Sequence, residues 1–253
     1  MAADLYLLKK CVTDRIVYVR MYRWKPATIT IGYMQDPDTL LDEVACTKDS
    51  IAWIRRPTGG RAVLHKEDLT YSCIFSKSMS DRMGNTVSES YRIISSCLMA
   101  GLARVGIDCL PHDSVLDSQE VRKQVKLPCF LAPNRDEIMV GGKKLVGSAQ
   151  KRTAEAVLQH GSIPITGAFR SLPLYQRATD DERQTMMKLL KRKCTSIEEI
   201  IGDIEPESIT AGLKRGFIET LGMEYEDQSW TCEEEKSISD TADSEEFRRS
   251  WLD

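Results

Sequence analysis

The 253-residue chain lacks any apolar run near the roughly 20 residues that a membrane-spanning helix requires. Its first ten residues, MAADLYLLKK, have neither the basic start nor the small-residue cleavage site of a secretory signal. These two absences predict a cytoplasmic protein that has no membrane segment.

None of the eight cysteines stands in a CxxC spacing, which argues against a zinc ribbon and a thioredoxin-like redox pair. The three histidines lack paired cysteine or carboxylate spacing and therefore indicate no catalytic metal. A chain of this length builds a core without disulfides. In a reducing cytosol most of its cysteines are expected to be small buried hydrophobic residues.

The net charge of −3 hides an asymmetry along the chain. Residues 224–253 carry 11 acidic and three basic side chains, a charge of −8, which leaves +5 on residues 1–223. A charge of +5 over that length is too weak to indicate nucleic acid, and no nucleic-acid-binding motif is present. We expect one domain over residues 1–223, followed by an acidic tail with the composition of a disordered segment.

Residues 55–72 have the sequence RRPTGGRAVLHKEDLTYS, which predicts a strand, a glycine turn, a strand, a short loop and another strand. Gly59 and Gly60 permit positive φ and a close approach of backbone to a ligand. Arg55 and Arg56 beside these glycine amides suit an anion such as a phosphate or carboxylate. A β-hairpin with solvated arginines is the simpler alternative.

The whole string resembles the RRxTGGxAVxH segment of the lipoate–protein ligase and octanoyltransferase family. The resemblance continues in residues 20–24 and 30–35, an expected hairpin, and in residues 142–150 and 158–162, two expected strands. It fades after Met223. It implies a single α/β domain of the biotin and lipoate ligase type, with a mixed, largely antiparallel sheet flanked by helices. Biotin ligases share the fold but carry a GRGRxGR-like loop that is absent here.

Lys144 matches the family's characteristic acyl-site lysine. The resemblance implies that its ammonium stabilises a developing oxyanion or a nearby thiolate. Without the surrounding motif, a solvated lysine after a hairpin turn is the simpler interpretation.

Cys129, in Pro128-Cys129-Phe130, decides between branches of the family. The closest resemblance is to the cysteine-dependent octanoyltransferases of the Gram-positive type. It implies that Cys129 takes octanoyl from acyl carrier protein as a thioester and passes it to a lipoyl-domain lysine, such as that of glycine-cleavage H protein. This chemistry needs no cofactor. The other octanoyltransferase class, with its cysteine further downstream, matches less well.

Two alternatives stay open at this point. The first is a lipoate–protein ligase catalytic domain that uses ATP and Mg²⁺ to form a lipoyl-adenylate. The second is a non-catalytic acyl-binding or carrier-binding protein.

The resemblance also implies a set of residues that border the substrate. These are Arg55, Arg56, Gly59, Gly60, His65, Gly147, Ser148, Ala149, His160 and Gly161. Two interpretations apply to His65 and His160: proton transfer at the amine-attack step, or structural hydrogen bonding. Tyr22 and Trp24 share one face of a strand and either wall the acyl pocket or pack in the core.

The remaining elements follow from periodicity and capping. The clearest helix begins at Thr86 with Glu89 as its capping-box partner and ends at Gly106. Other expected helices cover residues 4–12, 38–45, 180–193, 196–201 and 206–221, and the polar residues 77–85 are expected to form a loop. Other expected strands cover residues 16–24, 28–32, 137–140, 144 onward and 156–165, with a Gly141-Gly142 hairpin turn.

Overall fold

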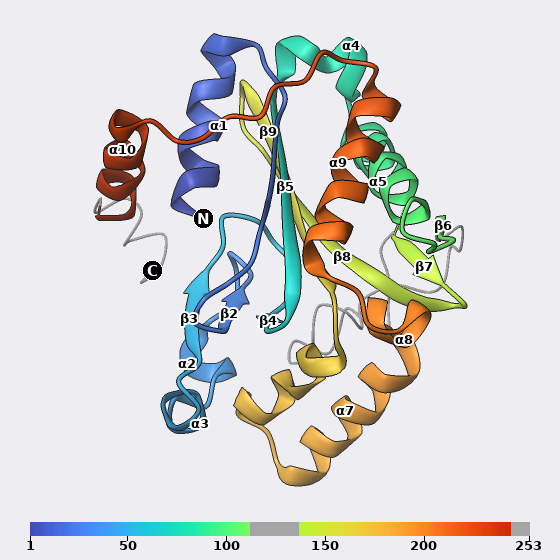
Figure 1. The fold of residues 1–253 in the computed structure, drawn as a ribbon. Helices are drawn as coiled ribbons and strands as arrows, with labels where there is room; N and C mark the ends of the chain where they lie inside the picture. Colours follow the sequence, from blue (N-terminus) through green and yellow to red (C-terminus); the bar gives the residue numbers. More distant parts are fainter. Residues whose placement is uncertain (112–136, 244–253) are drawn as a thin grey trace.

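A large antiparallel sheet forms the centre of the molecule in a computed structural model, which describes residues 1–111 and 137–243 (Figure 1). Its six strands lie in the order β1-β5-β9-β8-β7-β6. Their bounds are β1 Tyr18–Tyr22, β5 Asp68–Ser76, β6 Leu110–Pro111, β7 Ile138–Val140, β8 Lys143–Arg152 and β9 Ala156–Pro164. The three longest strands lie side by side in its middle, β5 pairing with β9 and β9 with β8.

A second, three-stranded sheet faces the large one near its lower end in Figure 1. Its order is β3-β2-β4, with bounds β2 Thr28–Ile31, β3 Ala52–Arg55 and β4 Val63–His65. Strand β2 pairs parallel with β3 and antiparallel with β4. The fold is therefore a mixed, largely antiparallel α/β arrangement, as the sequence predicts.

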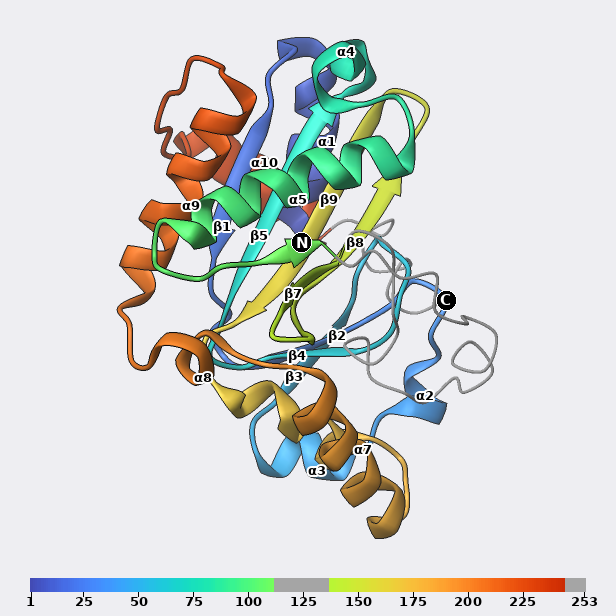
Figure 2. The same cartoon turned by 90° about the vertical axis from the view of Figure 1, so that its right-hand side faces the viewer.

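Helices cover both faces of the large sheet (Figures 1 and 2). Their bounds are α1 Ala2–Asp14, α2 Pro37–Leu40, α3 Glu43–Lys48, η1 Lys77–Met79, α4 Ser80–Met83, α5 Val87–Ala103, η3 Gly167–Tyr175, α7 Asp180–Lys193, α8 Ile197–Ile201, α9 Pro206–Leu221 and α10 Cys232–Asp243. Helices α5 and α9 pack on one face, and α1 lies on the other beside the small sheet. None of the helices in the described ranges is long and apolar enough to cross a bilayer.

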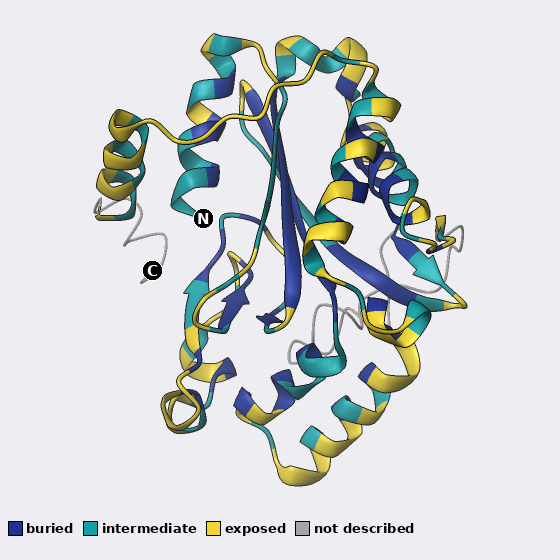
Figure 3. Ribbon diagram, viewed as in Figure 1, coloured by how far each residue is buried: buried dark blue, intermediate teal, exposed yellow. Residues whose placement is uncertain are grey.

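The main core lies between the large sheet and the α5–α9 pair, and the central strands β5 and β9 are buried along their length (Figure 3). The two helices approach closely because glycines face each other. A Cβ on Gly216 would lie 2.3 Å from the Gly101 nitrogen, and one on Gly101 would lie 2.5 Å from the Leu213 Cα. Alternate residues of β5, including Tyr71, Cys73 and Phe75, belong to this core. The opposite face of β5 and β9 is thereby left for the small sheet and α1.

Most predicted elements are confirmed. Helix α5 has both hydrogen bonds of the capping box, from Glu89 N–H to Thr86 Oγ1 at 3.1 Å and from Thr86 N–H to the Glu89 carboxylate at 3.1 Å. Strands β7 and β8 form the predicted hairpin, with positive φ at both Gly141 and Gly142. Helices α7, α8 and α9 occur where expected, and Gly222 ends α9 in the left-handed conformation.

One predicted hairpin is wrong, and so is the simple hairpin considered as the alternative at the TGG turn. Strands β1 and β2 do not pair with each other, because β1 joins the large sheet beside β5 while β2 lies in the small sheet. Strands β3 and β4 are also not neighbours, because β2 lies between them. The segment that contains the TGG turn therefore crosses over β2.

Three further segments differ from the sequence expectation. The helix expected over residues 38–45 is split, since Asp36 caps α2 and Asp42 caps α3. Residues 77–83, expected as a loop, form η1 and α4. The acidic tail contains helix α10, where little regular structure was expected. Helix α10 contacts α1 through an ion pair of 2.6 Å between Lys10 and Glu234.

Candidate functional site

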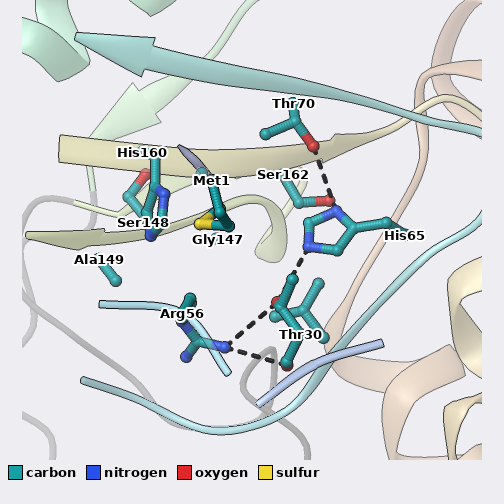
Figure 4. A pocket seen from close by; sticks show the side chains of 12 residues that line it. Met1, Thr30, Arg56, His65, Thr70, Gly147, Ser148, Ala149, His160 and Ser162 are labelled. Atoms are coloured by element: carbon teal, nitrogen blue, oxygen red, sulfur yellow. Dashed lines mark hydrogen bonds between the residues drawn. The ribbon is translucent and has the colours of Figure 1, made fainter. Parts of the chain in front are cut away.

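The two sheets enclose a small cavity on the face of the large sheet opposite α5 and α9 (Figure 4). Its lining residues come from both sheets and from the start of α1. They are Met1, Thr30, Arg56, Val63, His65, Thr70, Gly147, Ser148, Ala149, His160, Gly161 and Ser162. The cavity volume of about 30 Å³ has room for about two water molecules. A longer apolar ligand therefore requires side chains to move aside.

Arg56 organises the TGG turn next to this cavity. Its guanidinium donates to the carbonyl oxygens of Gly59 and Arg61, each at 2.8 Å, and to that of Thr30 at 3.1 Å. It also donates to Thr58 Oγ1 at 3.1 Å. The side chain is 4% exposed. Arg56 is thus neither a solvated hairpin arginine nor a free anion ligand in this conformation, because its donors hold the turn against β2.

Arg55 has a similar position on the other side of the turn. It is buried and donates to the carbonyl oxygens of Tyr33, at 2.9 Å, and Gln35. Its Nε has no hydrogen-bond partner within the described residues. Gly60 has φ of 95°, and a Cβ on Gly32 would lie 1.9 Å from the Gly60 carbonyl oxygen. The turn therefore packs directly on the end of β2, which explains the glycines at both positions.

His65 is held by a buried hydrogen-bond network. Its Nδ1 lies 2.8 Å from the Asp68 carboxylate, and its Nε2 lies 3.0 Å from Thr30 Oγ1. Trp24 stacks on the imidazole at 4.7 Å between ring centroids and donates its indole N–H to Thr70 Oγ1 at 2.8 Å. Both ring nitrogens of His65 have hydrogen-bond partners, so the geometry favours a structural hydrogen-bonding role for this residue.

His160 has a different environment. Its Nε2 lies 2.7 Å from Thr58 Oγ1, while its Nδ1 has no hydrogen-bond partner in the described part of the chain. Burial lowers the pKa of His160 to about 3, so the imidazole is neutral at physiological pH. A neutral ring with one free nitrogen at the cavity suits a hydrogen bond to a substrate group better than the storage of a proton.

Lys144 lies at the start of β8 as part of a buried ion pair. Its Nζ is 2.5 Å from Glu137 Oε1, and both side chains are about 5% exposed. The β7–β8 pairing shifts between Ile138 and Met139, so Leu145 is an extra residue on β8. Ile138 packs in the main core, so the preceding Glu137 points to the opposite face. We infer that the bulge turns the Lys144 side chain to the face of the large sheet that carries the cavity.

Lys143 occupies a different environment from its neighbour. It is half-buried, and together with a hydrogen bond from Arg170 it lowers the pKa of the Glu199 carboxyl. Only Lys144 of the two shares the buried ion pair with Glu137.

Cys129 lies outside the described residues. The segment that carries it joins the described structure at Glu137, the partner of Lys144. Burial raises the pKa of several described cysteines, to about 11 for Cys11 and about 12 for Cys97 and Cys109. These thiols are poor nucleophiles because thiolate formation is disfavoured.

Seven of the predicted substrate-bordering residues line one cavity although they lie far apart in the sequence. They are Arg56, His65, Gly147, Ser148, Ala149, His160 and Gly161. Arg55, Gly59, Gly60 and Lys144 lie outside that lining, and their roles stay predictions. Five lining residues were not predicted from the sequence: Met1, Thr30, Val63, Thr70 and Ser162. Thr70 and Ser162 are paired residues on β5 and β9, a register that one sequence does not reveal.

Gly161 predicts a sharp steric effect at the centre of the site. A Cβ there would lie 2.5 Å from the Gly147 carbonyl oxygen and 2.6 Å from the Tyr71 ring. Gly161→Ala should therefore force β8 and β9 apart, lowering the free energy of unfolding by about 1–3 kcal/mol, together with activity. Urea denaturation measures this. Gly59→Ala is the control for stability, because a Cβ there would meet no atom of the described residues within 4 Å apart from its chain neighbours. Equal stability of the two variants would contradict the packing described here.

The fold is that of lipoate–protein ligases. The chain is similar to the crystal structure of lipoate-protein ligase A bound with ATP, with a TM-score of 0.77, 24% identity and coverage of 98% of this chain and 92% of that one. It is also similar to a bi-partite lipoate protein ligase from Thermoplasma acidophilum, with a TM-score of 0.79 and 21% identity. That match covers 98% of this chain and 90% of the other.

Sequence comparison identifies the family. The model described as "Lipoyl protein ligase A/B catalytic domain" matches residues 1–218, so the chain belongs to this family. Octanoyltransferase LipM of Lysinibacillus sphaericus is 34% identical, with coverage of 86% of this chain and 79% of the relative. Octanoyltransferase LipM of Bacillus subtilis is 32% identical, with coverage of 92% and 85%.

Proposed function

We propose that this chain is an octanoyltransferase of protein lipoylation that works through a thioester at Cys129, with Lys144 as the cation at the reacting carbonyl. Its relatives named octanoyltransferase LipM support the activity, and they confirm the sequence prediction of an acyltransferase. The donor is octanoyl-acyl carrier protein, and the acceptor is a lipoyl domain such as that of glycine-cleavage H protein. The reaction uses no cofactor.

The reaction consists of two exchanges at one carbonyl. The Cys129 thiolate attacks the donor thioester, and collapse of the tetrahedral intermediate forms the Cys129 thioester and releases the carrier thiolate. The acceptor lysine amine then attacks this thioester, an amide forms, the Cys129 thiolate leaves and the amine loses a proton. Each attack places negative charge on the carbonyl oxygen, where a fixed ammonium stabilises the transition state.

The single observation that carries the proposal is the buried Lys144–Glu137 pair at the point where the Cys129 segment joins the described structure. A charged lysine is costly to bury, and buried ionisable groups cluster at functional sites. This argument also weakens the non-catalytic alternative, since simple apolar binding requires no buried cation.

The ATP-dependent ligase alternative has less support from the site. A triphosphate with Mg²⁺ is bound by several donors and cations that have no other partner. Arg55 and Arg56, the arginines at the glycine turn, donate to main-chain carbonyl oxygens. The relatives from Lysinibacillus sphaericus and Kyrpidia tusciae are also named as octanoyltransferases rather than ligases.

A transfer assay tests the proposal against the ligase. The chain is incubated with an apo lipoyl domain and either octanoyl-acyl carrier protein without ATP or octanoate with ATP and Mg²⁺. We expect modification of the lipoyl domain only with the carrier-bound donor, measured as an intact-mass increase. Modification with octanoate and ATP, and none with the carrier-bound donor, would replace the thioester route by an adenylate route.

A further inference from the structure

The contacts of Lys144 single out a residue that the family motif does not include. Glu137 precedes β7, and its Oε1 lies 2.5 Å from Lys144 Nζ. We propose that Glu137 is the positioning residue for Lys144, keeping its ammonium charged and fixed at the cavity face of the sheet. This inference rests on the proposed function of Lys144.

The β7–β8 hairpin holds the backbone of the pair. Glu137 immediately precedes β7, and Lys144 is the second residue of β8, which the Gly141-Gly142 turn joins to β7. The Lys144 carbonyl accepts a hydrogen bond of 3.0 Å from the Thr195 N–H, and Lys144 forms a parallel bridge with Cys194. Glu137 then orients the long side chain that extends from this fixed backbone.

Burial explains why the carboxylate is needed. A lysine with about 5% of its side chain exposed loses hydration, which disfavours its charged form, whereas a carboxylate at 2.5 Å restores that form. Removing the carboxylate therefore moves the pKa of Lys144 downward. The catalytic cation would then be lost as pH rises through the lowered pKa, and it would be retained at lower pH.

Other charged groups pack around the same region. Arg170, from η3, donates to the Cys194 carbonyl at 3.1 Å and pairs with Glu199 of α8 at 2.5 Å. Lys143, on the adjacent position of β8, acts on the same Glu199 carboxyl. Lys144 pairs with Glu137 beside this network.

The test compares Glu137→Gln with the unaltered chain across a pH series. Glutamine keeps the shape of the side chain but removes its charge. The ratio of the variant's kcat/KM to that of the unaltered chain should fall with rising pH, about tenfold for each pH unit above the lowered pKa of Lys144. The ratio removes the pH dependence that the two proteins share. Glu219→Gln, which removes the carboxylate of the exposed Arg104–Glu219 pair, is the matched control.

Glu137→Asp is the second variant, and it decides the question if Glu137→Gln does not fold. Aspartate keeps the negative charge, but its side chain is one methylene shorter and holds the carboxylate further from Lys144. We therefore expect reduced transfer, with a ratio of kcat/KM to that of the unaltered chain that does not change with pH. A folded Glu137→Gln with a flat ratio would overturn the positioning role, as would normal transfer by Glu137→Asp. If either result is found while the unaltered chain is active and Lys144→Ala is inactive, the proposed function still holds. An unaltered chain that transfers nothing would reject the function itself.

Discussion

Cys129→Ala should lose octanoyl transfer by on the order of a thousandfold or more, because alanine removes the nucleophile that carries the acyl group. The change deletes one sulfur atom and is expected to leave folding intact. The assay is transfer from octanoyl-acyl carrier protein to an apo lipoyl domain, with folding followed by circular dichroism.

Cys109→Ala is the matched control for this experiment. Cys109 is half-buried and its pKa is raised to about 12 by burial, so it is not a thiolate at neutral pH. Its replacement should leave transfer close to normal. Near-normal transfer by Cys129→Ala would mean that no thioester forms at this residue, and an adenylate mechanism would then be preferred.

Lys144→Ala should lower kcat/KM by on the order of a hundredfold or more, the typical effect of removing one oxyanion-stabilising donor. The change also removes one partner of a buried ion pair, which costs about 3–5 kcal/mol of stability. Urea denaturation must therefore accompany the kinetics, and the assay temperature must lie in the folded range of the variant.

Lys143→Ala controls for the loss of a lysine on the same strand. Lys143 is half-buried and lies in the neighbourhood of Glu199, outside the Lys144–Glu137 pair. Its replacement should change kcat/KM by less than about threefold and stability by less than about 0.5 kcal/mol. Comparable losses at the two positions would mean that the bulge does not aim Lys144 at the site.

Local signals in the sequence were sufficient for helices such as α5, α7 and α9 and for one hairpin. Thr86 and Glu89 define the start of α5 because a capping box needs only residues three apart. Gly141-Gly142 defines the β7–β8 turn because both residues adopt positive φ. These features depend on near neighbours, so a single sequence reveals them.

Long-range pairing was not predictable in the same way. Strands β1 and β2 follow each other in sequence, yet their apolar faces pack in different cores, and so they enter different sheets. The buried donors of Arg56 satisfy carbonyl oxygens whose positions depend on that arrangement. Glu137 was missed as the partner of Lys144 because their contact depends on the bulge at Leu145, which strand alternation does not foresee.

The most direct measurement of the thioester mechanism is to trap the acyl group in the absence of an acceptor. The chain is incubated with octanoyl-acyl carrier protein alone, quenched in acid, and examined by intact mass and peptide mapping. The mechanism predicts one octanoyl group per chain on the peptide that contains Cys129, removable by hydroxylamine at neutral pH. The mechanism would be contradicted by an unmodified chain that still transfers octanoyl to a lipoyl domain, or by an octanoyl group on another cysteine.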